Sequence, residues 1–79
     1  MSGTGDRTLD TRGLLCPEPI IELASEIAQM GPGGVLTVIS DDSAFPLDAR
    51  AWCAGTGNEL LSLEERGREF LARIRKRTD

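Results

Sequence analysis

The stretch "RGLLCPEPIIELA" at residues 12–24 constrains this chain most, because a cysteine stands directly before two prolines and an apolar pattern with helical spacing. Proline is favoured at the first position of a helix, where its missing N–H needs no partner and its fixed φ already suits the helix. The stretch therefore predicts a helix that begins at Pro17 and has Cys16 as its N-cap residue. It also predicts that this thiol lies at a helix end that faces solvent.

The segments on either side of this helix predict strands. Residues 8–13, "TLDTRG", alternate briefly and end in glycine, which is typical of an edge strand that runs into a loop. The helix is amphipathic, and "GPGG" at residues 31–34 ends it. The β-branched run "VLTVIS" at residues 35–40 then predicts a central strand. The apolar side of the helix is formed by Ile20, Leu23, Ala24, Ile27 and Met30.

The second half of the chain predicts another helix and a hairpin. Capping residues and Pro46 precede a helix over roughly residues 45–54, and glycines follow it. The segments "ELLSLEE" and "REFLARIRK" flank Arg66-Gly67, which indicates a tight turn between two strands. Two apolar stripes compete for the buried side of the second helix: Phe45, Ala49, Trp52 and Cys53, or Leu47, Ala51 and Ala54.

The resulting order, β-α-β-α-β-β, predicts an α+β fold. We expect a two-layer α/β sandwich in which a four-stranded mixed sheet carries both helices on one face. A length of 79 residues fits one small domain, and we expect a disordered leader over residues 1–7 and the domain over residues 8–77. The polar start and the lack of a long apolar run predict a cytoplasmic protein without a membrane span.

Composition excludes several kinds of chemistry. The chain has no histidine, so the Cys–His pair of thiol proteases is absent, and it has no C-x-x-C motif. With so few soft ligands we expect no metal site. A net charge of -4 argues against nucleic acid as the main ligand. In a reducing compartment we expect Cys16 and Cys53 to be free thiols rather than a disulfide.

The predicted position of Cys16 favours a reactive thiol. The free N–H groups and the dipole of a helix N-terminus favour an anion, so we expect a thiol pKa somewhat below about 8.5, with Glu18 and Glu22 offsetting part of the effect. The alternative is that Cys16 is a small buried hydrophobic residue, as free cysteines often are. An exposed thiol without a general base suits attack on sulfur, or carriage of it, because thiol exchange needs only a thiolate and access.

The segment "LDTRGLLCPEPI" resembles the Cys-Pro-X-Pro signature that opens the first helix of the TusA/SirA-like sulfur carrier family. The resemblance continues through "PGGVLTVISDD", through Asp48 with Trp52, and into "RIRK", so that it spans roughly residues 8–77. It departs from the family at Gly57-Asn58, where many members have Gly-His, and at Asp42-Ser43, where many have Asp-Pro.

The resemblance implies a function and a set of site residues. Cys16 would carry sulfur as a persulfide, received from a cysteine desulfurase or a rhodanese-type donor and passed to an acceptor protein. The outlets known for the family are tRNA thiolation, molybdenum cofactor assembly and sulfur oxidation. We expect a monomer with no cofactor, no direct nucleic acid partner and no membrane partner. The positioning residues would be Arg12, Gly13, Pro17, Glu18 and Pro19.

Three features keep alternatives open. Cys53 is either a packed helix residue or a resolving thiol for Cys16, and the latter would make the chain a redox sensor. The basic strand end, formed by Arg73, Arg75, Lys76 and Arg77, is either a nucleic-acid patch, a docking surface for partner proteins or a set of charges on a solvated sheet edge. The pair Asp41 and Asp42 is either a metal site or a set of helix caps. A small regulatory or protein-binding module with an incidental cysteine is the competing function.

Overall fold

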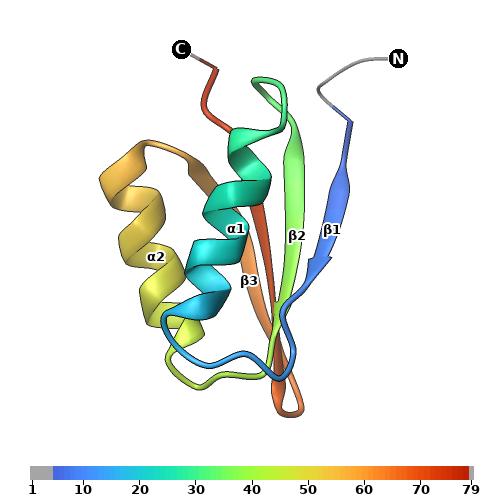
Figure 1. Cartoon of the computed structure of the whole chain (residues 1–79), viewed down its shortest axis with the longest axis vertical. Coiled ribbons are helices and arrows are strands. Elements are labelled where there is room, and N and C mark those ends of the chain that lie inside the picture. Colours follow the sequence, from blue (N-terminus) through green and yellow to red (C-terminus); the bar gives the residue numbers. More distant parts are fainter. Residues whose placement is uncertain (1–4, 79) are drawn as a thin grey trace.

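The computed structural model describes residues 5–78, and in it two helices cover one face of a four-stranded sheet (Figure 1). The strand order is β1-β2-β4-β3, with β1 parallel to β2 and the other neighbours antiparallel. The predicted α+β sandwich, with its mixed sheet and both helices on one face, is confirmed. The elements are β1 (Arg7–Asp10), α1 (Glu18–Ala28), β2 (Val35–Ser40), α2 (Phe45–Thr56), β3 (Glu59–Arg66) and β4 (Glu69–Arg75).

The N-terminal edge of the sheet begins one residue before the predicted domain boundary. Arg7 is the first residue of β1 and pairs with Leu36 of β2. Gly5 and Asp6 precede it without regular structure, and the rest of the predicted leader, residues 1–4, lies outside the described part of the chain. As predicted, β1 is a short edge strand, while β2 lies between β1 and β4.

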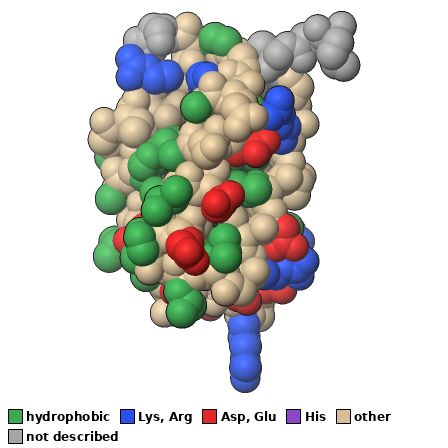
Figure 2. Space-filling model, viewed as in Figure 1, with side chains coloured by type: hydrophobic (Ala, Val, Ile, Leu, Met, Phe, Trp, Pro, Cys, Tyr) green, Lys and Arg blue, Asp and Glu red, His purple; other side chains and the backbone are tan. Residues whose placement is uncertain are grey.

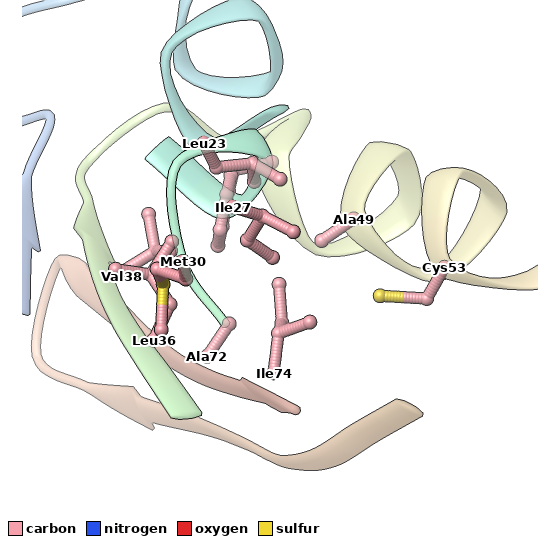
Figure 3. Close-up of a cluster of buried hydrophobic side chains, with 10 residues drawn as sticks. Leu23, Ile27, Met30, Leu36, Val38, Ala49, Cys53, Ala72 and Ile74 are labelled. Atoms are coloured by element: carbon pink, nitrogen blue, oxygen red, sulfur yellow. The ribbon is translucent and has the colours of Figure 1, made fainter. Parts of the chain in front are cut away.

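The core lies between the helices and the sheet (Figure 3). On the predicted apolar side of α1, Leu23 and Ile27 are buried and Ile20 and Ala24 are half-buried. In β4, Ala72 and Ile74 are buried while Arg73 and Arg75 are exposed. In α2 the first of the two stripes faces the sheet, whereas Leu47 of the second is 74% exposed. The buried core residues are Leu23, Ile27, Met30, Leu36, Val38, Phe45, Ala49, Cys53, Ala72 and Ile74.

The start of α1 differs from the prediction by one residue. Pro17 is the N-cap, with φ −96° and ψ 12°, and Glu18 is the first helical residue. The carbonyl of Pro17 accepts the first helical hydrogen bond, from the Ile21 N–H at 3.2 Å. The prediction that Cys16 is the N-cap is therefore wrong: Cys16 precedes the cap, joined to Pro17 by a cis peptide bond.

Two other boundaries also shift. The helix α2 extends two residues beyond the predicted 54, because Gly55 is tolerated inside it and Gly57, with φ 83°, closes it by donating its N–H to the Cys53 carbonyl at 2.9 Å. In the hairpin Arg66 still pairs with Glu69, so the turn is Gly67-Arg68 and not Arg66-Gly67. No helix within residues 5–78 is long and apolar enough to cross a membrane.

Both helices begin at the same end of the molecule, at the bottom of Figure 1, and both end at the top. At the top, two consecutive cations follow β4. The Lys76 ammonium donates to the Met30 carbonyl just beyond α1, and the Arg77 guanidinium donates to the Thr56 carbonyl at the end of α2, at 2.6 and 2.8 Å. These cations stabilise the negative ends of the helix dipoles. The bottom of the molecule, which carries Cys16, therefore contains both positive helix ends.

Candidate functional site

The loop between β1 and α1 carries Cys16 and is fixed to the sheet at its start. Thr11 is buried, and both its N–H and its hydroxyl donate to the Ile39 carbonyl of β2, at 2.7 and 2.6 Å. The Leu14 N–H then donates to the Thr11 carbonyl at 3.1 Å. Because β1 and β2 are parallel, their carboxyl ends lie side by side, so this loop meets the segment that follows β2.

That segment holds the loop through its two carboxylates. Asp41 accepts a hydrogen bond from the Gly13 N–H, and Asp42 accepts one from the Cys16 N–H, both at 3.0 Å. Asp42 is itself fixed, because its N–H donates to the buried Ser40 hydroxyl at 3.1 Å. Both carboxylates therefore position the backbone around Cys16.

In the structure Asp41 and Asp42 accept backbone hydrogen bonds, as capping residues do. Within residues 5–78 no group of three or more His, Cys, Asp or Glu side chains could hold a metal ion. Asp42 also accepts a weak bond from the Ala44 N–H at 3.4 Å, and Ala44 is the N-cap of α2. Asp42 therefore supports the start of α2 and ties that start to the Cys16 loop, whereas Asp41 binds the loop at Gly13.

The Cys16 thiol is exposed and donates a hydrogen bond to Asp48 Oδ2 at 3.0 Å. Asp48 lies in the first turn of α2, so the contact joins the starts of the two helices. This hydrogen bond raises the pKa of Cys16, and desolvation and the negative charges of Asp48 and Asp42 raise it further. The prediction of a lowered thiol pKa is wrong, because carboxylates distant in the sequence outweigh the favourable helix end.

Arg12 and Gly13 lie in the loop that leads to Cys16, and each fixes the conformation of that loop. The Arg12 guanidinium forms ion pairs with Asp10 at 2.7 Å and with Glu69 of β4 at 3.1 Å. The hydrogen bonds from Arg12 lower the pKa of Asp10 to about 2, and these carboxylates raise the pKa of Arg12. Gly13 has φ 89°, a left-handed conformation that favours glycine. Arg12 therefore links the loop to β1 and β4 instead of contacting the thiol.

Arg73 and Arg75 are not brought close to Cys16. Both are exposed and alternate with buried Ala72 and Ile74, so they lie on the face of the sheet away from the helices. Arg75 pairs with Val35 of β2. Val35 is five residues from Ser40, the end of β2 nearest the Cys16 loop, and this separation is about 16 Å along an extended strand. Arg75 also forms an ion pair with Glu59. The sheet-edge interpretation is wrong in one respect, because β4 is an interior strand.

Cys53 has the opposite environment to Cys16. It is 4% exposed and its sulfur points from α2 into the core cluster (Figure 3). Burial raises the pKa of its thiol. Both cysteines are free in the structure. The packing interpretation of Cys53 is therefore favoured over a resolving role, since its thiol lies inside the core while that of Cys16 is exposed on the surface.

The sequence interpretation assigned no role at the thiol to Asp48 or to the exposed apolar residues at this end of the molecule. Asp48 contacts the thiol directly, and three large apolar side chains of the Cys16 loop and of the first turns of α1 and α2 are 58% to 74% exposed: Leu15, Ile21 and Leu47. Leu15 precedes Cys16, Ile21 is in the first turn of α1, and Leu47 precedes Asp48. A sequence signal exists for Ile21, which is an apolar residue off the buried stripe of α1, whereas Leu47 belongs to the second of the two competing α2 stripes and Leu15 lies in the loop before α1.

The chain matches known proteins over nearly its whole length. Residues 7–76 match the family described as Sulfurtransferase TusA. The chain is 40% identical over 74 residues to the sulfur carrier protein TusA of Pseudomonas entomophila, covering 94% of this chain and 92% of that protein. It is 37% identical to the sulfur carrier protein TusA of Pseudomonas aeruginosa over the full length of both.

A longer relative and a solved structure extend these matches. A putative sulfur carrier protein of Aquifex aeolicus is 39% identical over 94% of this chain, which corresponds to 38% of that longer protein. The crystal structure of a SirA-like protein from Desulfitobacterium hafniense matches the fold with a TM-score of 0.79 and 28% identity, over 90% of this chain and 97% of that one. A thiol set before the first helix of this fold, in a chain that matches the family from β1 past β4, places the protein in the TusA family of sulfurtransferases.

Proposed function

We propose that this protein performs the sulfur carrier role of its family through Cys16, which accepts sulfane sulfur as a persulfide and passes it to an acceptor protein. The observation that carries this assignment is the environment of the thiol. Cys16 is the exposed member of the two cysteines, and its backbone is fixed by Asp42. The matched relatives named as sulfur carrier proteins support the same role.

The transfer is an exchange of one persulfide for another. The Cys16 sulfur bonds to the terminal sulfur of the donor persulfide, the sulfur–sulfur bond of the donor breaks, and the donor thiolate leaves and takes up a proton. The proton of the Cys16 thiol is released. No external oxidant is consumed, because the oxidation of the Cys16 sulfur is balanced by the reduction of the donor sulfur. Onward transfer repeats these steps with an acceptor thiolate as the attacking group.

The residues around Cys16 would act by positioning it. The Gly13 N–H donates a hydrogen bond to Asp41, which fixes the loop that carries the thiol. Pro19 is buried in the first turn of α1 and fixes the start of that helix. Pro17 caps the helix, Glu18 begins it, and Arg12 joins the loop to the sheet. In this proposal Cys16 reacts and the other five residues hold its geometry.

The proposal implies protein partners. The donor would be a cysteine desulfurase or a rhodanese-type protein, and the acceptor would belong to tRNA thiolation, molybdenum cofactor assembly or sulfur oxidation. We propose that the protein acts as a monomer without a cofactor. We also propose a cytoplasmic location, where reducing conditions keep both thiols free.

The direct test is the mass of the intact protein after incubation with a cysteine desulfurase and cysteine. We expect a gain of one or more sulfur atoms on Cys16 and its removal by dithiothreitol. Cys16→Ser should abolish loading and onward transfer, whereas the matched control Cys53→Ser should load normally. Sulfur on Cys53, or transfer that persists in Cys16→Ser, would contradict the assignment. A binding module with an incidental cysteine would instead keep its partner and its effect in Cys16→Ser.

A further inference from the structure

The surface around Cys16 combines exposed apolar side chains with carboxylates. Hydrophobic and acidic side chains gather on the lower half of the helix face, while the Lys and Arg side chains lie toward the rim of this view (Figure 2). The large apolar residues that are exposed among residues 5–78 are Leu15, Ile21 and Leu47, and each lies beside the Cys16 loop or in the first turn of a helix. Exposed apolar residues that gather at one place mark an interaction surface.

The charges beside the thiol are negative. The Cys16 N–H donates to Asp42 and the Cys16 thiol donates to Asp48, both at 3.0 Å. The nearest arginine in the sequence, Arg12, forms ion pairs with Asp10 and Glu69. Within the described residues, the side-chain groups that hydrogen-bond to Cys16 are therefore carboxylates and not cations.

This arrangement holds the sulfur in its less reactive form. A thiol that donates to a carboxylate keeps its proton, and the thiolate is the form that attacks a sulfur atom. A carrier nevertheless has to become nucleophilic when its donor arrives. The group that restrains Cys16 is partly exposed in the first turn of α2, where a cation from another protein can reach it.

We propose that Leu15, Ile21 and Leu47 dock a sulfur-donating partner protein whose matching surface is apolar with a central Lys or Arg, and that this cation pairs with Asp48 and so releases the Cys16 thiolate. The apolar residues supply the contact area, and the acidic centre selects the basic partner by charge complementarity. This inference rests on the proposed sulfur carrier function for the nature of the partner. Asp48 is a positioning residue in it, since it acts through Cys16.

The chemical steps balance without a further reactant. When the partner's cation pairs with Asp48, the thiol loses its hydrogen-bond acceptor and the negative charge beside it is compensated, so its proton passes to solvent. The Cys16 thiolate then bonds to the terminal sulfur of the partner's persulfide, and the partner's sulfur–sulfur bond breaks. The partner's thiolate takes a proton from solvent, which returns the proton count to its starting value.

The test compares Asp48→Asn with a control of equal charge change, Glu59→Gln. Asparagine keeps the size of the side chain but carries no charge. Glu59 pairs with Arg75 at the far end of the sheet, so its substitution removes one negative charge away from Cys16. Three rates are measured for each protein at pH 7: alkylation by iodoacetamide, loading from glutathione persulfide, and loading from a cysteine desulfurase supplied with cysteine.

The proposal predicts opposite effects of Asp48→Asn on the two kinds of reagent. Alkylation and loading from glutathione persulfide should rise by about three- to tenfold, because more of the thiol is ionised. Loading from the desulfurase should fall by about threefold or more and lose part of its salt dependence, because the partner's cation has lost its counter-charge. Glu59→Gln should leave all three rates within about twofold of the unmodified protein, as exposed ion pairs contribute little.

Several outcomes overturn the proposal. An unchanged alkylation rate in Asp48→Asn would show that Asp48 does not restrain the thiol. An equal rise with both sulfur donors would show that no partner cation uses Asp48. Absence of loading from either donor in the unmodified protein would count against the sulfur carrier function itself, and the alkylation rates would still decide the role of Asp48.

The apolar residues are tested separately. Leu47→Ala and Ile21→Ala should each lower loading from the desulfurase by about threefold or more while leaving alkylation unchanged, because they remove contact area and not the restraint on the thiol. Ala51→Ser, on the exposed side of α2, is the matched control and should leave both rates unchanged. Unaltered desulfurase loading in both apolar variants would overturn the assigned docking surface.

Discussion

Cys16 and Cys53 both have raised pKa values, yet the two thiols are kept protonated by different means. The Cys16 thiol is exposed and donates to Asp48, whereas Cys53 is buried among the core residues of α2. A neighbouring carboxylate can be compensated by a visiting cation, but burial ends only when the structure opens. A raised thiol pKa therefore does not by itself distinguish the two cysteines. What distinguishes them is the cause of the shift, because a partner can neutralise a neighbouring carboxylate but cannot reverse burial.

The largest expected difference is in reactivity toward a small alkylating agent. Under native conditions Cys16 should react about a hundredfold or more faster than Cys53, because Cys53 reacts only through local or global opening. Mass analysis of peptides from a timed iodoacetamide reaction measures both rates in one sample. Urea at a concentration that unfolds the chain should bring the rates together. Comparable alkylation rates of Cys16 and Cys53 in the native protein would contradict the difference in exposure between the two thiols.

The same difference bears on the redox alternative. Mild oxidant should link two molecules through Cys16 rather than join Cys16 to Cys53 within one molecule, since the second sulfur is inside the core. Non-reducing mass measurement distinguishes the two products. An intramolecular disulfide that forms without loss of the fold would restore the resolving role of Cys53.

The next effect is on stability. Cys53→Ala should lower the free energy of unfolding by about 1–2 kcal/mol, because it removes buried atoms from a packed cluster. Cys16→Ala removes an exposed side chain and should change it by less than about 0.5 kcal/mol. Urea unfolding followed by circular dichroism measures both, with unchanged m-values expected. A larger cost at Cys16 would mean that its contact with Asp48 contributes to the fold.

A smaller effect is expected from pH. A thiol with a raised pKa in the folded state keeps its proton while the unfolded thiol loses one, so the unfolding free energy falls as pH rises above about 8.5 and is unaffected below. The buried Cys53 thiol contributes at most about 1.4 kcal/mol per pH unit. Urea unfolding from pH 7 to 9.5 should show this slope, and Cys53→Ala should flatten it. An equal slope in that variant would contradict burial as the cause.

The smallest effect is expected on the sheet face away from the helices. Arg73→Glu should change loading from a cysteine desulfurase by less than about twofold, because Arg73 does not lie with the Cys16 loop and exposed charges act chiefly on encounter rates. The rate is measured at low and high salt. A larger loss of loading rate that becomes smaller at high salt would show that the docking surface includes β4. It would support the role of Arg73 and Arg75 in docking partner proteins.

The fold was predictable because each element carries its own local pattern. The alternation of Ala72 and Ile74 with Arg73 and Arg75, and the spacing of Leu23 and Ile27, report directly which side is buried. The errors are at boundaries. At Pro17, Gly55 and Gly67 a nearby residue also fits the sequence pattern of a helix end or a tight turn. The hydrogen bonds of the fold decide at which residue the helix or turn is placed.

The site was predictable only in part. The exposed thiol follows from its place before α1, which the prolines indicate. Its contacts do not follow, because Asp42 and Asp48 come from a different strand end and a different helix. The parallel pairing of β1 and β2 brings the Cys16 loop beside Asp42, and the predicted mixed sheet did not specify which side chains meet there. For this reason the sign of the thiol pKa shift was predicted wrongly.

The ends of the described chain lie at the pole opposite to Cys16. Gly5 and Thr78 both approach the Gly33-Gly34 turn that follows α1, at the top of Figure 1. An additional domain, a linker or an affinity tag joined at either end would therefore extend away from the Cys16 sulfur and leave it open to large proteins. Protein immobilised through either end should therefore keep the Cys16 thiol facing outward.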